Sequence, residues 1–152
     1  MSDGGRKFTY RLEALVKLRS AERDALKTDL ERANDAVESK ARECDDLKRA
    51  IELAESALRA LYRAGSELPL DGQQRLQLYL KQQRELRGAK QRELEEASRA
   101  MMRVLSELEL KVQDTKALES HRERKQRQFD EQELRLNLNA ADEQWMRRKR
   151  DA

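Results

Sequence analysis

The sequence contains few of the residues that build a compact core or interrupt a helix. It has 1 proline, 5 glycines and 1 cysteine in 152 residues, and aromatic residues make up 4% of the chain. A globular domain needs more large apolar side chains than this to offset the entropy that its chain loses on folding. The single cysteine, Cys44, excludes an intrachain disulfide. Its position at a helical core spacing predicts a small buried apolar side chain.

Long apolar runs are also missing. No segment approaches the length of a membrane-spanning helix, and the first residues contain no apolar core of a signal peptide. We therefore expect a cytoplasmic protein.

Charge is abundant and nearly balanced. Charged residues make up 41% of the chain, with 33 Lys and Arg against 30 Asp and Glu. A mean hydropathy of -1.05 is low enough for a disordered chain. However, Leu, Ala, Glu, Arg and Gln dominate, and these strong helix formers are typical of long helices and coiled coils. The composition favours a coiled coil over disorder.

Helix-breaking residues divide the chain at two places, the N-terminus and the segment GSELPLDG. In that segment Gly65 is predicted to cap the end of one helix, and Asp71 to cap the start of the next. The predicted parts are a flexible tail over 1–7, a first coiled-coil helix over 8–63, a connecting loop over 64–72, a second coiled-coil helix with a C-terminal overhang over 73–146, and a basic tail over 147–152.

A heptad pattern runs through the first predicted helix. Steps of 3 and 4 residues from Leu12 to Leu61 meet apolar side chains, interrupted only by Arg19, Arg23 and Lys40. Such a repeat is typical of a left-handed supercoil.

The second predicted helix has a looser pattern. Its apolar positions are clean from Leu94 to Leu108, whereas Tyr79 and Leu86 fit a seam shifted by one residue, which predicts a stutter near Lys90.

Because the connecting loop is short, we predict an all-α fold, a long antiparallel two-helix coiled-coil hairpin. Pairing Leu61 with Leu76 makes the numbers of facing residues add to about 137. This register brings Arg19 near Glu119 and Arg23 near Asp114. The chain beyond about residue 130 is then expected to project past the start of the first helix, without a continuous partner.

The sequence offers little for catalysis. His121 is the only histidine, and no acid cluster, glycine-rich turn or cysteine accompanies it, so we interpret it as a solvated surface residue. We find no phosphate-binding loop, metal-ligand spacing or nucleophile motif. We expect a protein that is not an enzyme and needs no metal or cofactor.

Two basic runs, HRERKQR and MRRKR, raise the alternative of nucleic-acid binding. Glu123 interrupts the first run, both lie beyond the clean heptads, and no aromatic platform accompanies them. A solvated helix face is favoured over DNA or RNA contact.

Several apolar residues lie off the heptad seam and indicate contacts with partners. Leu15 and Leu18 widen the apolar surface near the N-terminus, and Tyr62, Tyr79 and Leu86 gather near the loop. The others lie on the second predicted helix in a segment without an expected intramolecular partner: Phe129, Leu134, Leu136, Leu138, Trp145 and Met146.

Three stretches resemble the FliJ family of flagellar export proteins: FTYRLEALVKLR, GSELPLDGQQRLQLYLKQQ, and the pattern from ALESHRERKQRQFDEQE to AADEQW. The family is also similar to stalk proteins of virulence type III secretion systems. The resemblance implies a coiled-coil stalk that binds a hexameric export ATPase through the end bearing both termini. It also implies contact with the cytoplasmic domain of a membrane-embedded export gate, association with the export apparatus at the inner membrane, and handling of substrate chaperones.

Carried to this chain, the resemblance suggests two sets of contact residues. The candidates for the ATPase ring are Leu15, Leu18, Arg19, Arg122, Phe129 and Leu136. The candidates for the export gate are Tyr62, Tyr79, Gln83 and Leu86. A cytoskeletal or scaffolding coiled coil remains an alternative function. We expect a monomeric hairpin, although a four-helix dimer also fits the pattern. A flagellar and a virulence system both remain open.

Overall fold

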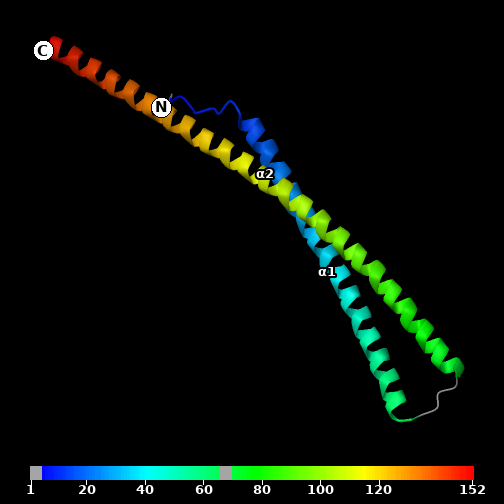
Figure 1. The fold of residues 1–152 in the computed structure, drawn as a ribbon. Coiled ribbons are helices and arrows are strands. Elements are labelled where there is room, and N and C mark those ends of the chain that lie inside the picture. Colours follow the sequence, from blue (N-terminus) through cyan, green and yellow to red (C-terminus); the bar gives the residue numbers. More distant parts are fainter. Residues whose placement is uncertain (1–4, 66–69) are drawn as a thin grey trace. The chain divides into compact units, whose positions relative to one another are not determined.

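The protein consists of two long helices. The computed structural model describes residues 5–65 and 70–152. It contains α1 (Glu13–Arg63) and α2 (Leu70–Arg150), and the described residues include no strand (Figure 1). The predicted all-α hairpin is confirmed.

The helix bounds differ from the predicted ones at three positions. α1 begins at Glu13 instead of residue 8. Residues 5–10 are non-helical, and a turn over residues 11–12 leads into the helix. α2 begins at Leu70, so Asp71 lies in its first turn and is not the N-cap. An acid there still interacts favourably with the helix dipole. Residues 1–4 of the predicted tail, and residues 66–69 of the predicted loop, lie outside the described residues.

α2 also continues beyond the predicted end at residue 146. It ends at Arg150, and its last turn holds the basic residues Arg147, Arg148, Lys149 and Arg150. Positive charge at a helix C-terminus is favourable because the unpaired carbonyl groups there carry a partial negative charge. The predicted basic tail is therefore largely the last turn of the helix.

The predicted cap at the end of α1 is confirmed. Gly65 has a φ of 61°, in the left-handed region that glycine adopts without steric cost. Its amide donates to the carbonyl of Tyr62 at 3.4 Å, and that of Ala64 donates to Ala60 at 3.0 Å. These bonds satisfy carbonyl groups that the helix end would leave unpaired.

The chain forms two compact units, and each contains part of both helices. The terminal unit comprises residues up to Ala25 and from Leu108 onward, and the loop unit comprises Leu26–Glu107. Ion pairs show that the helices are antiparallel within each unit: Glu22–Lys111 in the terminal unit, and Lys40–Glu93 and Glu43–Lys90 in the loop unit. The two numbers add to 133 in these three pairs, to 135 in Glu13–Arg122 of the terminal unit and to 139 in Glu55–Arg84 of the loop unit, close to the predicted 137.

The core of the loop unit follows the predicted heptads. Cys44 and Ile51 of α1 are buried, as is Leu80 of α2, and the burial of Cys44 confirms its interpretation as a small core residue. The predicted shifted seam is wrong. Tyr79 and Leu86 are exposed, whereas the unshifted positions Gln83 and Lys90 are half-buried.

The core of the terminal unit is small and mixed. Tyr10 is 7% exposed and Thr115 is 1% exposed. The Thr115 hydroxyl donates to the carbonyl of Lys111 at 2.8 Å, which satisfies the buried polar group within its own helix. From Leu134 to Arg150 every residue is exposed, as expected for an overhang without an intramolecular partner.

Candidate functional site

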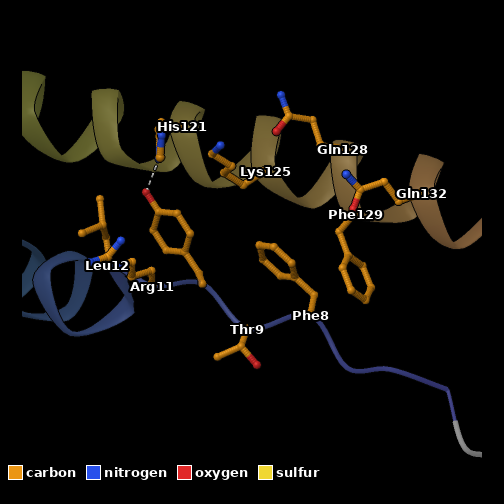
Figure 2. Close-up of a pocket in the computed structure, with 10 residues that line it drawn as sticks. Phe8, Thr9, Arg11, Leu12, His121, Lys125, Gln128, Phe129 and Gln132 are labelled. Carbon is orange, nitrogen blue, oxygen red and sulfur yellow. Dashed lines mark hydrogen bonds between the residues drawn. The ribbon is translucent and has the colours of Figure 1, made fainter.

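An aromatic strap distinguishes the terminal unit. We call residues 5–12 the N-terminal strap; it runs along α2 instead of extending α1 (Figure 2). The Phe8 ring centroid lies 5.6 Å from that of Phe129, with the rings tilted by 56°. Phe8 also stacks on Tyr10 at 6.4 Å. Aromatic pairs at these separations stabilise packing beyond the area that they bury.

The strap is fixed to α2 by a hydrogen bond. The hydroxyl of Tyr10 lies 2.6 Å from Nδ1 of His121, and the two rings are 5.7 Å apart (Figure 2). His121 is half-buried, so its interpretation as a solvated surface residue is wrong. Its partner is 111 residues away in sequence, and nothing in the sequence around His121 indicates that partner.

A pocket of about 600 Å³ lies between the strap and α2. Phe8, Tyr10, Leu12 and Phe129 form its apolar part, and Arg11, Lys125, Gln128 and Gln132 contribute polar side chains. The pocket holds a single histidine and no carboxylate, so its lining does not provide the acid and base pair typical of hydrolytic sites. The pocket is the space left between the side chains of the strap and those of α2.

Intramolecular contacts occupy several of the predicted ATPase-ring residues. Phe129 packs against Phe8, which corrects the expectation that it has no intramolecular partner. Arg122 Nε lies 3.1 Å from a carboxylate oxygen of Glu13, and Arg19 lies 3.0 Å from Glu22.

The remaining ring candidates differ in exposure. Leu15 is half-buried, whereas Leu18 is 54% exposed and Leu136 is 50% exposed. Of the six candidates, Leu18 and Leu136 are the apolar side chains that solvent reaches most fully.

The predicted gate residues all lie in the loop unit. Tyr62 is 57% exposed, and Tyr79 and Leu86 are less exposed, at 43% and 44%. Tyr79 and Leu86 are seven residues apart on α2, so they share one face of that helix. Gln83 is half-buried and belongs to the seam instead. Three of the four candidates are therefore accessible.

The ion pairs of the terminal unit differ from the predicted ones. Arg19 binds Glu22 of its own helix instead of Glu119, and Arg23 binds Asp24 at 3.2 Å instead of Asp114. Lys111 of α2 lies 2.8 Å from the same Glu22 carboxylate. The hydrogen bond from Lys111, followed by that from Arg19, lowers the pKa of Glu22 below its ordinary value.

A symmetric charge cluster, which was not predicted from the sequence, lies in the loop unit. Lys40 Nζ of α1 lies 2.8 Å from Glu93 of α2, and Lys90 Nζ of α2 lies 2.9 Å from Glu43 of α1. Within each helix the lysine also pairs with the glutamate three residues later, at 3.6 Å in α1 and 3.3 Å in α2. We call these four residues the Lys–Glu quartet.

The quartet explains why Lys40 is tolerated in an apolar seam. Hydrogen bonds across the helix pair lower the pKa of Glu43, chiefly through Lys90, and that of Glu93, chiefly through Lys40. The same bonds raise the pKa of both lysines. The sequence does contain a signal: KARE and KQRE place the same residue types at the same spacing in the two helices.

Comparison of the chain with protein-family models, curated proteins and solved structures found no match. Among residues 5–65 and 70–152, no group of His, Cys, Asp and Glu is arranged to hold a metal ion. Neither described helix has an apolar segment long enough to cross a membrane.

Proposed function

We propose that this chain is a non-enzymatic stalk component of a flagellar or type III protein export apparatus. In this role the terminal unit binds the hexameric export ATPase ring, and the loop unit contacts the export gate. Handling of substrate chaperones belongs to the same proposal. The observation that carries it is the antiparallel helix pair with exposed apolar side chains in each unit, Leu18 and Leu136 in one, Tyr62, Tyr79 and Leu86 in the other.

The charge of the terminal unit supports a docking role. Six Lys and Arg lie between residues 6 and 23, and four more between residues 121 and 128. Glu13 pairs with Arg122 and Glu22 pairs with Arg19, so most of these bases have no acid of the same two segments available to them. An excess of positive charge in a unit that also exposes Leu18 and Leu136 favours a protein partner with an acidic contact surface.

The direct test mixes the full chain with its cognate export ATPase. We expect the chain to promote hexamer assembly, measured by sedimentation, and to raise the rate of ATP hydrolysis. Leu18→Glu and Leu136→Glu should each weaken both effects, because a carboxylate at an apolar contact must be desolvated. Leu53→Glu is the matched control, since Leu53 is 74% exposed and lies in the loop unit.

Two outcomes would overturn the proposal. One is an ATPase whose assembly and hydrolysis do not respond to the chain. The other is full binding by a chain truncated after Leu118, which lacks His121, Phe129 and Leu136. A scaffolding coiled coil, the second candidate, predicts indifference to the ATPase.

A further inference from the structure

The overhang of α2 carries an apolar stripe. Leu134, Leu138, Ala141 and Trp145 follow one another at steps of 4, 3 and 4 residues, so they lie on one face of the helix. Leu134 is 59% exposed, Leu138 57% and Trp145 61%. Lys149 lies 5.0 Å from the centre of the Trp145 ring, along the edge of this face. We call the four residues the overhang stripe.

The stripe does not continue the seam of the hairpin. With about 100° of rotation per residue, Leu134 lies about 140° around the helix from Phe129, which packs on the strap. Leu136, by contrast, lies within about 20° of Phe129. The overhang stripe therefore faces away from the contacts that α2 makes within the terminal unit.

The spacing of the stripe is symmetric in sequence. In an antiparallel pair of two such helices, Leu134 faces Trp145 of the other helix and Leu138 faces Ala141, because both pairs of numbers add to 279. Leu134 then packs against the Trp145 ring, and Leu138 packs against the small Ala141. Such alternation of large and small side chains lets the two faces interdigitate. The same contacts occur twice, as a two-fold symmetric interface requires.

Charges flank the stripe with the same symmetry. Glu131 and Arg148 lie on the same face of the helix, just beyond the two ends of the stripe. Glu131 is three residues before Leu134, Arg148 is three residues after Trp145, and their numbers also add to 279. Each therefore faces the other in the antiparallel pair. At the edge, Arg135 lies close to Asp142 of the second helix. All four of these side chains are exposed within the single chain.

We propose that the overhang stripe is an interface with a second copy of this chain, formed by antiparallel pairing of the α2 overhangs. The apolar contacts supply the attraction, and the Glu131–Arg148 and Arg135–Asp142 pairs select the antiparallel direction. A parallel pair would instead place Glu131 beside Glu131 and Arg148 beside Arg148. One short helix pair buries less than about 1,200 Å², the size of weak and reversible interfaces.

The test is a charge-swap experiment on the full chain, read by sedimentation up to about 1 mM, which covers weak association. The wild type should dimerise reversibly. Glu131→Arg places two arginines opposite each other and Arg148→Glu places two glutamates opposite each other, so each variant alone should be monomeric. A mixture of the two variants restores opposite charges at both ends and should dimerise. So should the double variant Glu131→Arg/Arg148→Glu.

Trp145 provides a second measurement. It is the only tryptophan of the chain. In the dimer, Leu134 of the second copy covers its ring, so its fluorescence emission should shift to shorter wavelength as the wild type dimerises. Triple replacement of exposed acids in α1, Glu31→Lys/Asp35→Lys/Glu38→Lys, is the control and should leave dimerisation unchanged.

The inference is overturned if the wild type remains a monomer over this range. It is equally overturned if the wild type dimerises but the single variants do so with the same affinity. Neither outcome bears on the proposed export function, because Leu136, the ATPase candidate on the overhang, lies on the opposite face from the stripe.

Discussion

The hydroxyl of Tyr10 and Nδ1 of His121 lie 2.6 Å apart, and this hydrogen bond joins the non-helical N-terminal strap to the middle of α2. The bond explains why α1 begins only at Glu13. A helix that started at Phe8 would remove Tyr10 from His121 and Phe8 from Phe129. The strap contacts are therefore compatible only with a helix that begins after Tyr10.

Loosening of the strap is the first prediction. Tyr10→Phe removes a partly buried hydrogen bond and should lower the free energy of unfolding by about 1 kcal/mol. Phe8→Ala exposes the face of Phe129 and should lower it by about 1–2 kcal/mol. Amide hydrogen exchange of residues 7–12 should become faster in both variants. Thr9→Ala is the control, because Thr9 is exposed; equal exchange in Tyr10→Phe and Thr9→Ala would contradict the role of the bond.

The Lys–Glu quartet predicts a specific pH dependence of stability. The pKa values of Glu43 and Glu93 lie below the ordinary 4.5, so their stabilisation is present above pH 4.5 and is lost as the pH falls through their folded values. Lys40 and Lys90 have pKa values above the ordinary 10.5, so their contribution is lost only as the pH rises past 10.5. The quartet therefore acts fully between these two limits.

Urea unfolding in acid provides the measurement. The free energy of unfolding of the wild type should fall as the pH is lowered below about 4.5. The variant Glu43→Gln/Glu93→Gln should be less stable at pH 7 and should lose less stability in acid. Added salt should also lower the free energy of unfolding of the wild type more than that of the glutamine variant. The reason is that the quartet is partly exposed, so salt screens its ion pairs. Asp45→Asn/Asp46→Asn, at exposed positions of α1, should keep the wild-type profile, and a profile unchanged in the glutamine variant would argue against the quartet.

Two glycines should respond in opposite directions to replacement by alanine. Gly88 lies within α2, and an added Cβ would meet nothing within 4 Å. Gly88→Ala should therefore raise the free energy of unfolding by about 0.5–1 kcal/mol, the helix-propensity difference. Gly65 also has space for a Cβ, but its φ of 61° disfavours one, so Gly65→Ala should destabilise by about 1 kcal/mol. Thermal and urea unfolding measure the stability of the two variants directly. If Gly65→Ala were as stabilising as Gly88→Ala, the cap would not require glycine.

The sequence was sufficient to predict the hairpin because periodicity and helix breakers are local signals. The heptads from Val16 to Leu61 and the cap at Gly65 are examples, and both agree with the structure, whereas Leu12 lies outside α1 and is exposed. The start of α1 was not predictable in this way. Phe8 and Tyr10 fit a helical pattern as well as they fit a strap, and only their distant partners Phe129 and His121 decide between the two.

The candidate site illustrates the same limit. Exposure of Leu18 and Tyr62 follows from their positions off the seam. The packing of Phe129 and the pairing of Arg19 with Glu22 depend instead on which side chains the fold brings close. The repeated KARE and KQRE segments could have revealed the quartet, but only once the register had been known to within a few residues.

The quartet also limits how α2 can slide along α1 within the loop unit. If α2 slid past α1 by one heptad, Lys40 would face Leu86 or Ala100, and Lys90 would face Ala36 or Ala50. The four charges would then keep only their partners within the same helix and would lose both ion pairs that join the helices. The loop unit is therefore a coiled coil with one preferred register, in which movement imposed on one helix carries the other helix with it instead of shearing the pair.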